Sequence, residues 1–249
     1  MKSVLTVILG FSALYTLVPW FLTRILGVGV VRRGAGEKEI AFTFDDGPNP
    51  AYTPRLLDLL NQYGVKATFF VLGAKAEAYP EIIQRMHREG HQIGVHNYVH
   101  RANWFMLPWT VHKQVDRTSR VVERLTGERP SYYRPPWGVL NGCDFMWKRG
   151  HTFVLWSLMA HDWRSRTGKN TLKDKLQSRM EDGSIILLHD CGETFGADRE
   201  APAAMLVALA EVLEEQRGQG FRYVRIDELH TSDTVSVHVE QRASASKVM

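Results

Sequence analysis

The sequence predicts an α/β fold in which a parallel sheet closes into a barrel. Strand-like and helix-like segments alternate along most of the 249 residues, and such alternation is typical of parallel strands joined by helices. Seven segments have the character of strands, which favours a barrel over an open sheet. Polar and ionisable residues follow directly after most of these segments, at the strand ends where barrel proteins carry their sites.

The predicted strands are short, mostly apolar segments bounded by turn-forming or polar residues. They are Glu39–Phe44, Lys66–Val71, Gln92–Val95, Tyr132–Arg134, Thr152–Leu155, Ser184–Leu188 and Arg222–Val224. Helical patterns lie between them, several with proline in the first turn or glycine just past the end. The predicted helices are Pro54–Tyr63, Pro80–Glu89, Val111–Leu125, Asn141–Lys148, Thr171–Met180 and Ala201–Gln216.

An apolar segment precedes this domain. Ser3–Thr23 contains no charged side chain and is about as long as the ~20 residues that a membrane-spanning helix needs. A cleaved signal peptide has a shorter apolar core and a small-residue cleavage site, which this sequence lacks. We expect a transmembrane signal-anchor over residues 1–27, a linker over 28–37, a folded domain over 38–229 and a polar, mostly disordered tail over 230–249.

Composition excludes some functions. The net charge is +4 and the pI about 9.1, a mildly basic balance that suits an anionic surface. No basic block with interleaved aromatic residues is present, so we expect no nucleic-acid partner. The two cysteines, Cys143 and Cys191, are too few for a disulfide scaffold and are expected to be free thiols.

Two adjacent carboxylates, Asp45 and Asp46, follow the first predicted strand and precede a Gly47–Pro48 turn signal. Like charges within a few Å of each other raise one pKa or attract a cation. One carboxylate is therefore suited to bind a metal and the other to act as a base. Spacing alone does not assign the two roles, and a solvated turn has the same sequence.

Two histidines, His96 and His100, lie four residues apart after the third predicted strand. This spacing places both imidazoles on one face of a helical turn. With one aspartate they form a set of two histidines and one carboxylate, which resembles catalytic zinc sites. Iron(II) takes the same set, so the ligands alone do not identify the metal.

Three further residues suit supporting roles. Arg134 begins a rigid Arg134–Gly138 loop that contains two prolines, and it can orient the carboxylate that binds no metal through a bidentate pair. Asp162 and His189 can form a carboxylate–imidazole pair, which keeps an imidazole protonated as a general acid requires. A proline-rich turn and an ordinary core histidine are the structural alternatives.

Over Lys38–Leu229 the chain resembles the polysaccharide deacetylase family, also called the NodB-homology domain or carbohydrate esterase family four. The shared motifs occur in the family's order. They are Thr43–Pro48, Lys66–Val71, the pair His96 and His100, Arg134–Gly138, Asp162–Trp163 and Leu187–His189. The resemblance implies a distorted seven-stranded (β/α) barrel with a divalent metal, expected to be Zn²⁺ with Co²⁺ as an alternative.

The resemblance also implies a role for each motif residue. Asp45 would be the catalytic base, Arg134 would orient it, and His189 would be the general acid, tuned by Asp162. The remaining roles are those of metal ligands (Asp46, His96, His100), an oxyanion donor through its backbone N–H (Trp137) and the lining of the acetyl pocket (Trp163, Leu187). Asn97 departs from the Ser or Thr usual after the first histidine, and Met159–His161 lacks an acid that many members have.

A hydrolase of N-acetyl groups is the implied activity, with peptidoglycan or chitin-like N-acetylglucosamine polymers as substrate. By this resemblance, a bound metal would activate the water that attacks the acetamide carbonyl, Asp45 would accept a proton from that water, and His189 would protonate the leaving amine. An O-acetyl glycan esterase and a glycan-binding pseudoenzyme are the alternatives. Intact motif residues argue against the pseudoenzyme.

Location follows from this substrate, which lies outside the membrane. We expect a monomeric, single-pass cell-membrane protein with an extracytoplasmic domain, although Arg24, Arg32 and Arg33 after the apolar segment favour the opposite orientation. Aromatic residues at Trp104, Phe105 and Trp109 suit stacking on sugars, packing on the membrane or packing in the core.

Overall fold

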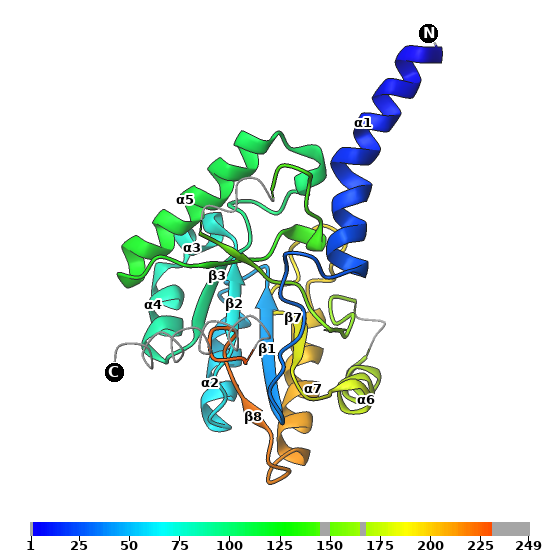
Figure 1. The fold of residues 1–249 in the computed structure, drawn as a ribbon. Helices are drawn as coiled ribbons and strands as arrows, with labels where there is room; N and C mark the ends of the chain where they lie inside the picture. Colours follow the sequence, from blue (N-terminus) through cyan, green and yellow to red (C-terminus); the bar gives the residue numbers. More distant parts are fainter. Residues whose placement is uncertain (1, 145–149, 165–167, 231–249) are drawn as a thin grey trace, which may run out of the picture.

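A curled parallel sheet forms the centre of the molecule (Figure 1). The computed structural model describes residues 2–144, 150–164 and 168–230. Its strands are β1 (Glu39–Asp45), β2 (Thr68–Val71), β3 (Gln92–Val95), β4 (Tyr132–Tyr133), β5 (Thr152–Phe153), β6 (Leu158–Met159), β7 (Ser184–His189) and β8 (Arg222–Tyr223). All seven predicted strands are confirmed, with small differences at their ends. The short β6 was not predicted.

Helices connect most of the strands. They are α1 (Lys2–Trp20), a π-helix η1 (Phe21–Ile25), α2 (Thr53–Gln62), α3 (Gly73–Ala78), α4 (Pro80–Arg88), α5 (Pro108–Thr126), α6 (Lys169–Arg179) and α7 (Ala201–Glu215), with short 3₁₀ turns η2 (Asn103–Phe105) and η3 (Pro136–Gly138). The prediction missed α3. Of the predicted helix Asn141–Lys148, residues 142–144 form a turn instead, and 145–148 lie outside the described residues.

The described strands make a half-barrel rather than a closed barrel. Their order is β5-β4-β3-β2-β1-β7-β6, so β5 and β6 are the two edges. In a closed barrel these two edges would pair with each other, and no such pairing occurs among the described strands. The last strand, β8, pairs instead with Glu39 and Ile40 at the start of β1. This edge of β1 is free there because β2 pairs only with Thr43–Asp45.

The segment predicted as a linker lies along the open side of the half-barrel. Val31 pairs with Val154 just after β5, and Arg33 pairs with Ser184 at the start of β7. Gly34 donates a backbone hydrogen bond to Gly183 at 2.7 Å. The segment therefore packs on the sheet and covers part of the seam between its edges, while the domain boundary at residue 38 stays a prediction.

This seam gives a stability prediction. Gly183 has φ +71°, and a Cβ there would collide with the backbone of Gly34. Gly183→Ala is expected to destabilise the fold by about 3 kcal/mol, from left-handed strain and overpacking together. Gly64 has φ +65° with open space around it, so Gly64→Ala should cost only about 1 kcal/mol. Thermal unfolding measures both, and equal losses would mean that the seam contact is not formed.

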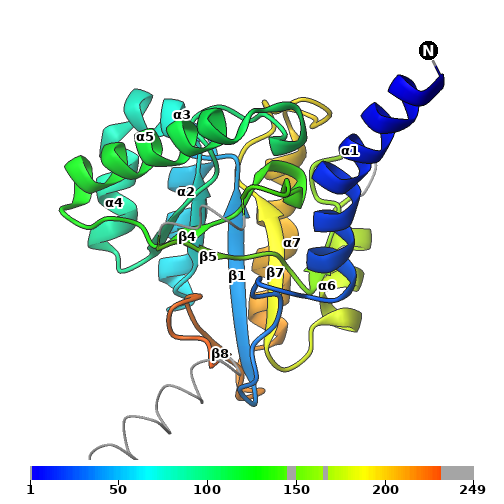
Figure 2. The same cartoon turned by 45° about the horizontal axis from the view of Figure 1, so that its top comes forward.

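Both faces of the sheet are buried. On β1, Ile40, Phe42 and Phe44 belong to the larger apolar core, which also contains side chains of α2, α4 and α7. Ala41 belongs to a second apolar cluster on the concave face. This alternation explains why the strand is apolar throughout, because parallel sheets are covered on both sides. Successive residues of β1 therefore belong to the two clusters in turn. Figure 2 shows α7 behind β1 and β7, on the side of the larger core.

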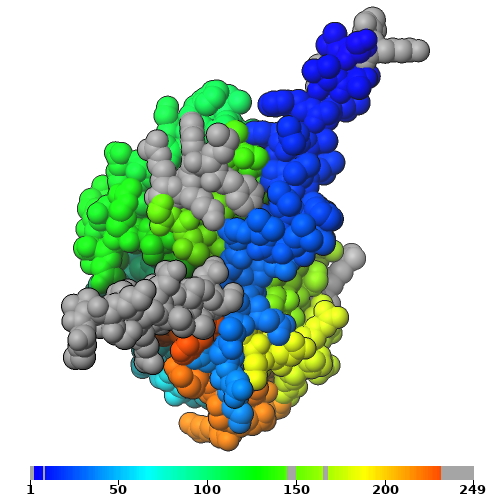
Figure 3. Space-filling view, viewed as in Figure 1, coloured from blue at the N-terminus to red at the C-terminus, as the bar shows by residue number. Residues whose placement is uncertain are grey.

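The N-terminal helix projects from the body of the molecule (Figure 3). Ser3–Ile25 has a mean hydropathy of 1.8, and 6% of its most apolar stretch is buried. By length and composition this helix is able to cross a membrane, a property that signal sequences share. Its second half touches the domain, since Pro19 and Thr23 are buried.

Candidate active site

The register of the sheet brings the predicted site residues together at the carboxyl ends of the strands. Asp45 lies beside His189 in the pairing of β1 with β7. Val95 pairs with Tyr133, so the residues that follow them, His96 and Arg134, also become neighbours. Strands in parallel register end at one edge of the sheet, and chemistry-bearing residues just past those ends therefore share one rim.

Left-handed backbone conformations mark the same rim. Among the described residues other than glycine, Asp46, Asn97, Trp137 and His161 have φ between 56° and 75°. Each follows a strand end, whereas the one further case, Lys38, precedes β1. Such conformations cost about 1–3 kcal/mol each and are found preferentially at functional sites. They turn the chain sharply, so that consecutive side chains point into different parts of the site.

Three side chains form a candidate metal centre. The Nε2 atoms of His96 and His100 each lie 3.3 Å from Oδ1 of Asp46. The three candidate ligand atoms fall within 4.8 Å of one another. Oδ1 of Asp46 is buried and has no hydrogen-bond partner among the described residues. A buried carboxylate oxygen facing two imidazole nitrogens without a donor suits a divalent cation.

The protonation states of these groups also suit a cation. The Nδ1 of His96 lies 2.7 Å from the carbonyl oxygen of Arg134, which can only accept, so Nδ1 carries the proton and Nε2 presents a lone pair. Burial lowers the pKa of His100 to about 4. Burial opposes charge on Asp46, but the neighbouring imidazoles of His96, His100 and His189 lower its pKa below the ordinary value.

Arg134 is fully buried and holds Asp45. Its Nη1 donates to Oδ1 of Asp45 at 2.8 Å and to Oγ1 of Thr43 at 2.7 Å. The predicted bidentate pair is not formed, because Nη2 and Nε donate to the carbonyls of Leu155 and Val154. A buried guanidinium must satisfy its donors. One oxygen of Asp45 is therefore fixed by Arg134, and the other stays available to the cleft.

His189 and Asp162 form the predicted pair. Nδ1 of His189 lies 2.9 Å from Oδ1 of Asp162, and the backbone N–H of His189 donates to Oδ2 at 2.6 Å. Burial disfavours the charged imidazole, but Asp162, Asp46 and Asp45 outweigh it and raise the pKa of His189 to about 9. Trp163 packs edge-on against the imidazole at 5.4 Å. Asp162 thus favours the protonated form of the imidazole.

These groups line one cleft of about 440 Å³. Of the ten predicted site residues, the cleft reaches all except Arg134 and Asp162, which lie behind Asp45 and His189. Leu187 and Trp163 contribute to its walls. Trp137 lies at the rim, 48% exposed, with its ring 4.2 Å from that of His100. Phe195, on the loop between β7 and α7, also lines the cleft and is 93% exposed.

Sequence reasoning missed Thr194. Its Oγ1 donates to Oδ2 of Asp46 at 2.7 Å, which leaves Oδ1 for a cation. The loop that carries it is held by Lys75, whose Nζ lies 2.6 Å from Sγ of Cys191 and 3.4 Å from Glu193. No motif distinguishes a threonine in a polar loop. The only signal was its position a few residues after the His189 strand end.

Thr194→Val should weaken metal binding about tenfold, because groups that hold a metal ligand in place typically contribute 10–100-fold to affinity. Calorimetric titration of the apo protein with Zn²⁺ measures this directly. Thr194→Ser keeps the hydroxyl and should restore affinity, and Phe195→Ala on the same loop should leave it unchanged. An unaltered affinity in Thr194→Val would show that the hydroxyl does not orient Asp46.

Asn97, which stands where the family usually has Ser or Thr, forms side-chain hydrogen bonds in the loop between the two histidines. Its Nδ2 donates to Oδ1 of Asn103 at 3.1 Å, and its Oδ1 accepts from the hydroxyl of Tyr133 at 2.9 Å. Asn103 in turn donates to Tyr133 and to Asp144. An amide both donates and accepts, and the side chain of Asn97 uses both capacities in this loop.

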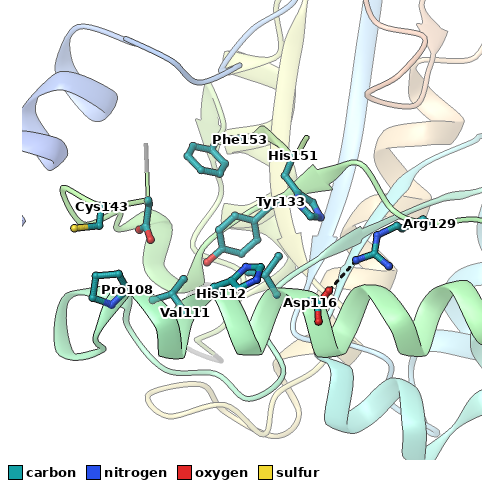
Figure 4. A pocket seen from close by; sticks show the side chains of 11 residues that line it. Pro108, Val111, His112, Asp116, Arg129, Tyr133, Cys143, His151 and Phe153 are labelled. Atoms are coloured by element: carbon teal, nitrogen blue, oxygen red, sulfur yellow. Dashed lines mark hydrogen bonds and ion pairs between the residues drawn. The ribbon is translucent and has the colours of Figure 1, made fainter. Parts of the chain in front are cut away.

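A second cavity, of about 180 Å³, lies between α5 and the β4–β5 region (Figure 4). Its walls include Tyr133, Cys143 and Phe153, and the ion pair between Arg129 and Asp116 lies at one side. It contains none of the predicted site residues. Cys143 and Cys191 are both free thiols, as expected.

Comparison with known proteins points to one family. A family model described as polysaccharide deacetylase matches residues 32–143. The peptidoglycan-N-acetylmuramic acid deacetylase PdaC of Bacillus subtilis is 36% identical over 193 residues, which cover 78% of this chain and 39% of that protein. A peptidoglycan-N-acetylglucosamine deacetylase of Bacillus cereus is 36% identical over 197 residues, 78% of this chain and 88% of that one.

Solved structures agree with the sequence comparison. A peptidoglycan N-acetylglucosamine deacetylase crystallised with a naphthalenyl-N-oxidanyl-benzamide is 31% identical with a TM-score of 0.76, covering 84% of this chain and 97% of that one. The structure of PdaC is 32% identical with a TM-score of 0.68, covering 86% and 96%. The chain nevertheless spans only 39% of the full length of curated PdaC and 42% of a Listeria monocytogenes relative.

Proposed function

The chain belongs to the polysaccharide deacetylase family, and from this premise we propose that it is a metal-dependent hydrolase of N-acetyl groups. Its proposed substrate is an N-acetylglucosamine-containing glycan, peptidoglycan or a chitin-like oligomer. The relatives named above are peptidoglycan deacetylases, and this supports a cell-wall glycan over a soluble metabolite.

The observation that best supports the proposal is that a candidate metal centre and an acid–base set share one cleft. Amide hydrolysis needs an activated water, stabilisation of the developing oxyanion and a proton for the leaving nitrogen. Asp45, whose second oxygen faces the cleft, is placed to accept the proton of the attacking water. His189 is placed to protonate the amine.

The proposed cofactor is a divalent cation, expected to be Zn²⁺, held by Asp46, His96 and His100. Bound there, it would lower the pKa of a water and polarise the acetamide carbonyl. The protein supplies the remaining parts. Arg134 holds Asp45 in position, Asp162 favours the protonated form of His189, and the backbone N–H of Trp137 is the proposed oxyanion donor. Trp163 and Leu187 are proposed to contact the acetyl methyl group.

We also propose that α1 anchors the protein in the cell membrane with the domain outside. The apolar stretch Ser3–Ile25 supports this part of the proposal, as does a substrate that lies in the cell wall. The anchor and the chemistry are independent, since the site residues all lie after residue 38.

Acetate release from N-acetylglucosamine oligomers and from peptidoglycan tests the chemistry. We expect release in the presence of Zn²⁺ or Co²⁺, and none after a chelator. An O-acetylated xylan oligomer run in parallel distinguishes an ester from an amide preference. No release from any acetylated glycan by folded, metal-loaded protein would reject the enzyme and favour a glycan-binding role.

A further inference from the structure

We propose that the loop before α5 forms a second membrane contact beside α1. Phe105 and Leu107 of this loop and Trp109 in the first turn of α5 are 88%, 56% and 52% exposed. These three residues are named here the aromatic tip. The proposal states that the aromatic tip enters the lipid interface next to the spanning helix. It rests on the proposed membrane anchor and is independent of the deacetylase chemistry.

Exposed and buried side chains alternate along the segment that leads into the aromatic tip. Leu107 and its neighbour Met106 have extended backbones, with ψ of 149° and 143°, and side chains of an extended chain alternate between two sides. Met106 accordingly points inward and is 7% exposed, while the residues on either side of it point outward. Large apolar side chains gathered on a protruding loop mark a surface that meets a partner.

The loop that carries the aromatic tip contacts α1, and none of the three tip residues lines the cleft. The hydroxyl of Tyr15 in α1 donates to the carbonyl of Met106 at 2.8 Å, and the backbone of Gly142 donates to the carbonyl of Tyr15 at 2.9 Å. Figure 1 shows α1 running past this end of α5. The exposed aromatic residues that line the cleft are others, Trp137 and Phe195, which argues against sugar stacking by the tip.

The length of α1 before Tyr15 indicates that the loop bound to Tyr15 contacts the membrane. Residues 3–14, which precede the contact at Tyr15, span only about 18 Å at 1.5 Å per residue. Crossing a hydrocarbon core of about 30 Å takes about 20 residues. A bilayer crossed by α1 and η1 therefore extends past Tyr15, and the loop bound to Tyr15 must enter it unless the helix leaves the domain.

The charges around the aromatic tip fit a bilayer surface. From Val99 to Val115 the sequence contains no acidic residue. Exposed Arg101 and Lys113 flank the tip. Basic residues bordering an apolar surface are attracted to anionic lipid head groups. The partner indicated by this chemistry is thus an anionic membrane, not a protein with an apolar groove alone.

Quenching of tryptophan fluorescence tests the proposal with the full chain in lipid nanodiscs of phosphatidylcholine and phosphatidylglycerol. The acyl chains carry bromine, which quenches only indoles that reach the lipid. The contribution of Trp109 is the difference between the wild type and Trp109→Phe. We expect Trp109 to be quenched by the brominated chains. The double variant Phe105→Glu, Leu107→Glu should reduce that contribution several-fold, whereas Val207→Glu, a matched exposed site on α7, should not.

The outcomes separate the two claims. If the protein stays in the discs but Trp109 is quenched by aqueous iodide and not by bromine, the proposed second membrane contact is wrong. The proposed membrane anchor is not affected by that result. Chain that does not enter the discs would overturn both. Acetate release measured on the same protein in detergent reports separately on the proposed chemistry.

Discussion

Asp45→Asn is expected to lower deacetylation about 10³-fold while Zn²⁺ stays bound with its original affinity. The size follows from the contribution of a positioned general base, typically 10²–10⁴-fold. Asparagine keeps an oxygen that accepts from Arg134 but cannot accept a proton from water. The kcat of acetate release and a calorimetric Zn²⁺ titration measure the two effects on one preparation.

A matched variant at the adjacent residue controls for the change of charge. Asp46→Asn removes the same charge one position along the chain, and it should weaken Zn²⁺ binding by at least tenfold. If the metal is lost from Asp45→Asn and retained by Asp46→Asn, then the two aspartates have the opposite roles.

His189→Gln is expected to lower kcat about 10²–10³-fold, because an amide is a poor leaving group without a proton donor. Glutamine can still donate a hydrogen bond but cannot transfer a proton. Activity on an activated ester, whose leaving group needs no proton, should be affected far less. Equal losses on the amide and the activated ester would mean that His189 does not act as the general acid.

The pH dependence of kcat follows from the same residue. The pKa of His189 is raised from 6.5 to about 9, and the acid must be protonated, so activity is expected to hold below that value and to fall as pH rises through it. A cation at Asp46 offsets part of the nearby negative charge, which places the basic limb at or below about 9. In His189→Gln this limb should disappear, and a limb that persists would belong to another group.

The sequence predicted the position of site residues best where those residues lie close to the end of a strand. Asp45 and Asp46 adjoin a strand whose apolar run identifies it, and parallel strands must bring their carboxyl ends together. The sequence alone therefore predicts that His96, Arg134 and His189 lie on one rim. Their individual roles came from the family resemblance, since spacing does not distinguish a ligand from a base.

Details set by loops and by competition between hydrogen bonds could not be predicted. Thr194 reaches Asp46 only through the conformation of the β7–α7 loop. The bidentate contact of Arg134 failed because backbone carbonyls near β5 take its other donors. Likewise, β8 joins β1 rather than closing the barrel, because β1 is longer than β2 and leaves its first residues unpaired on that edge.

The central claim is that Asp46, His96 and His100 hold a divalent cation while Asp45 remains free. Anomalous X-ray scattering at the zinc edge, from a crystal of the Zn²⁺-loaded protein, tests it most directly. We predict one strong peak about 2.0–2.2 Å from an Asp46 oxygen and from Nε2 of both histidines, with no coordinating oxygen from Asp45. A peak coordinated by Asp45, or no peak among these residues, would contradict the account.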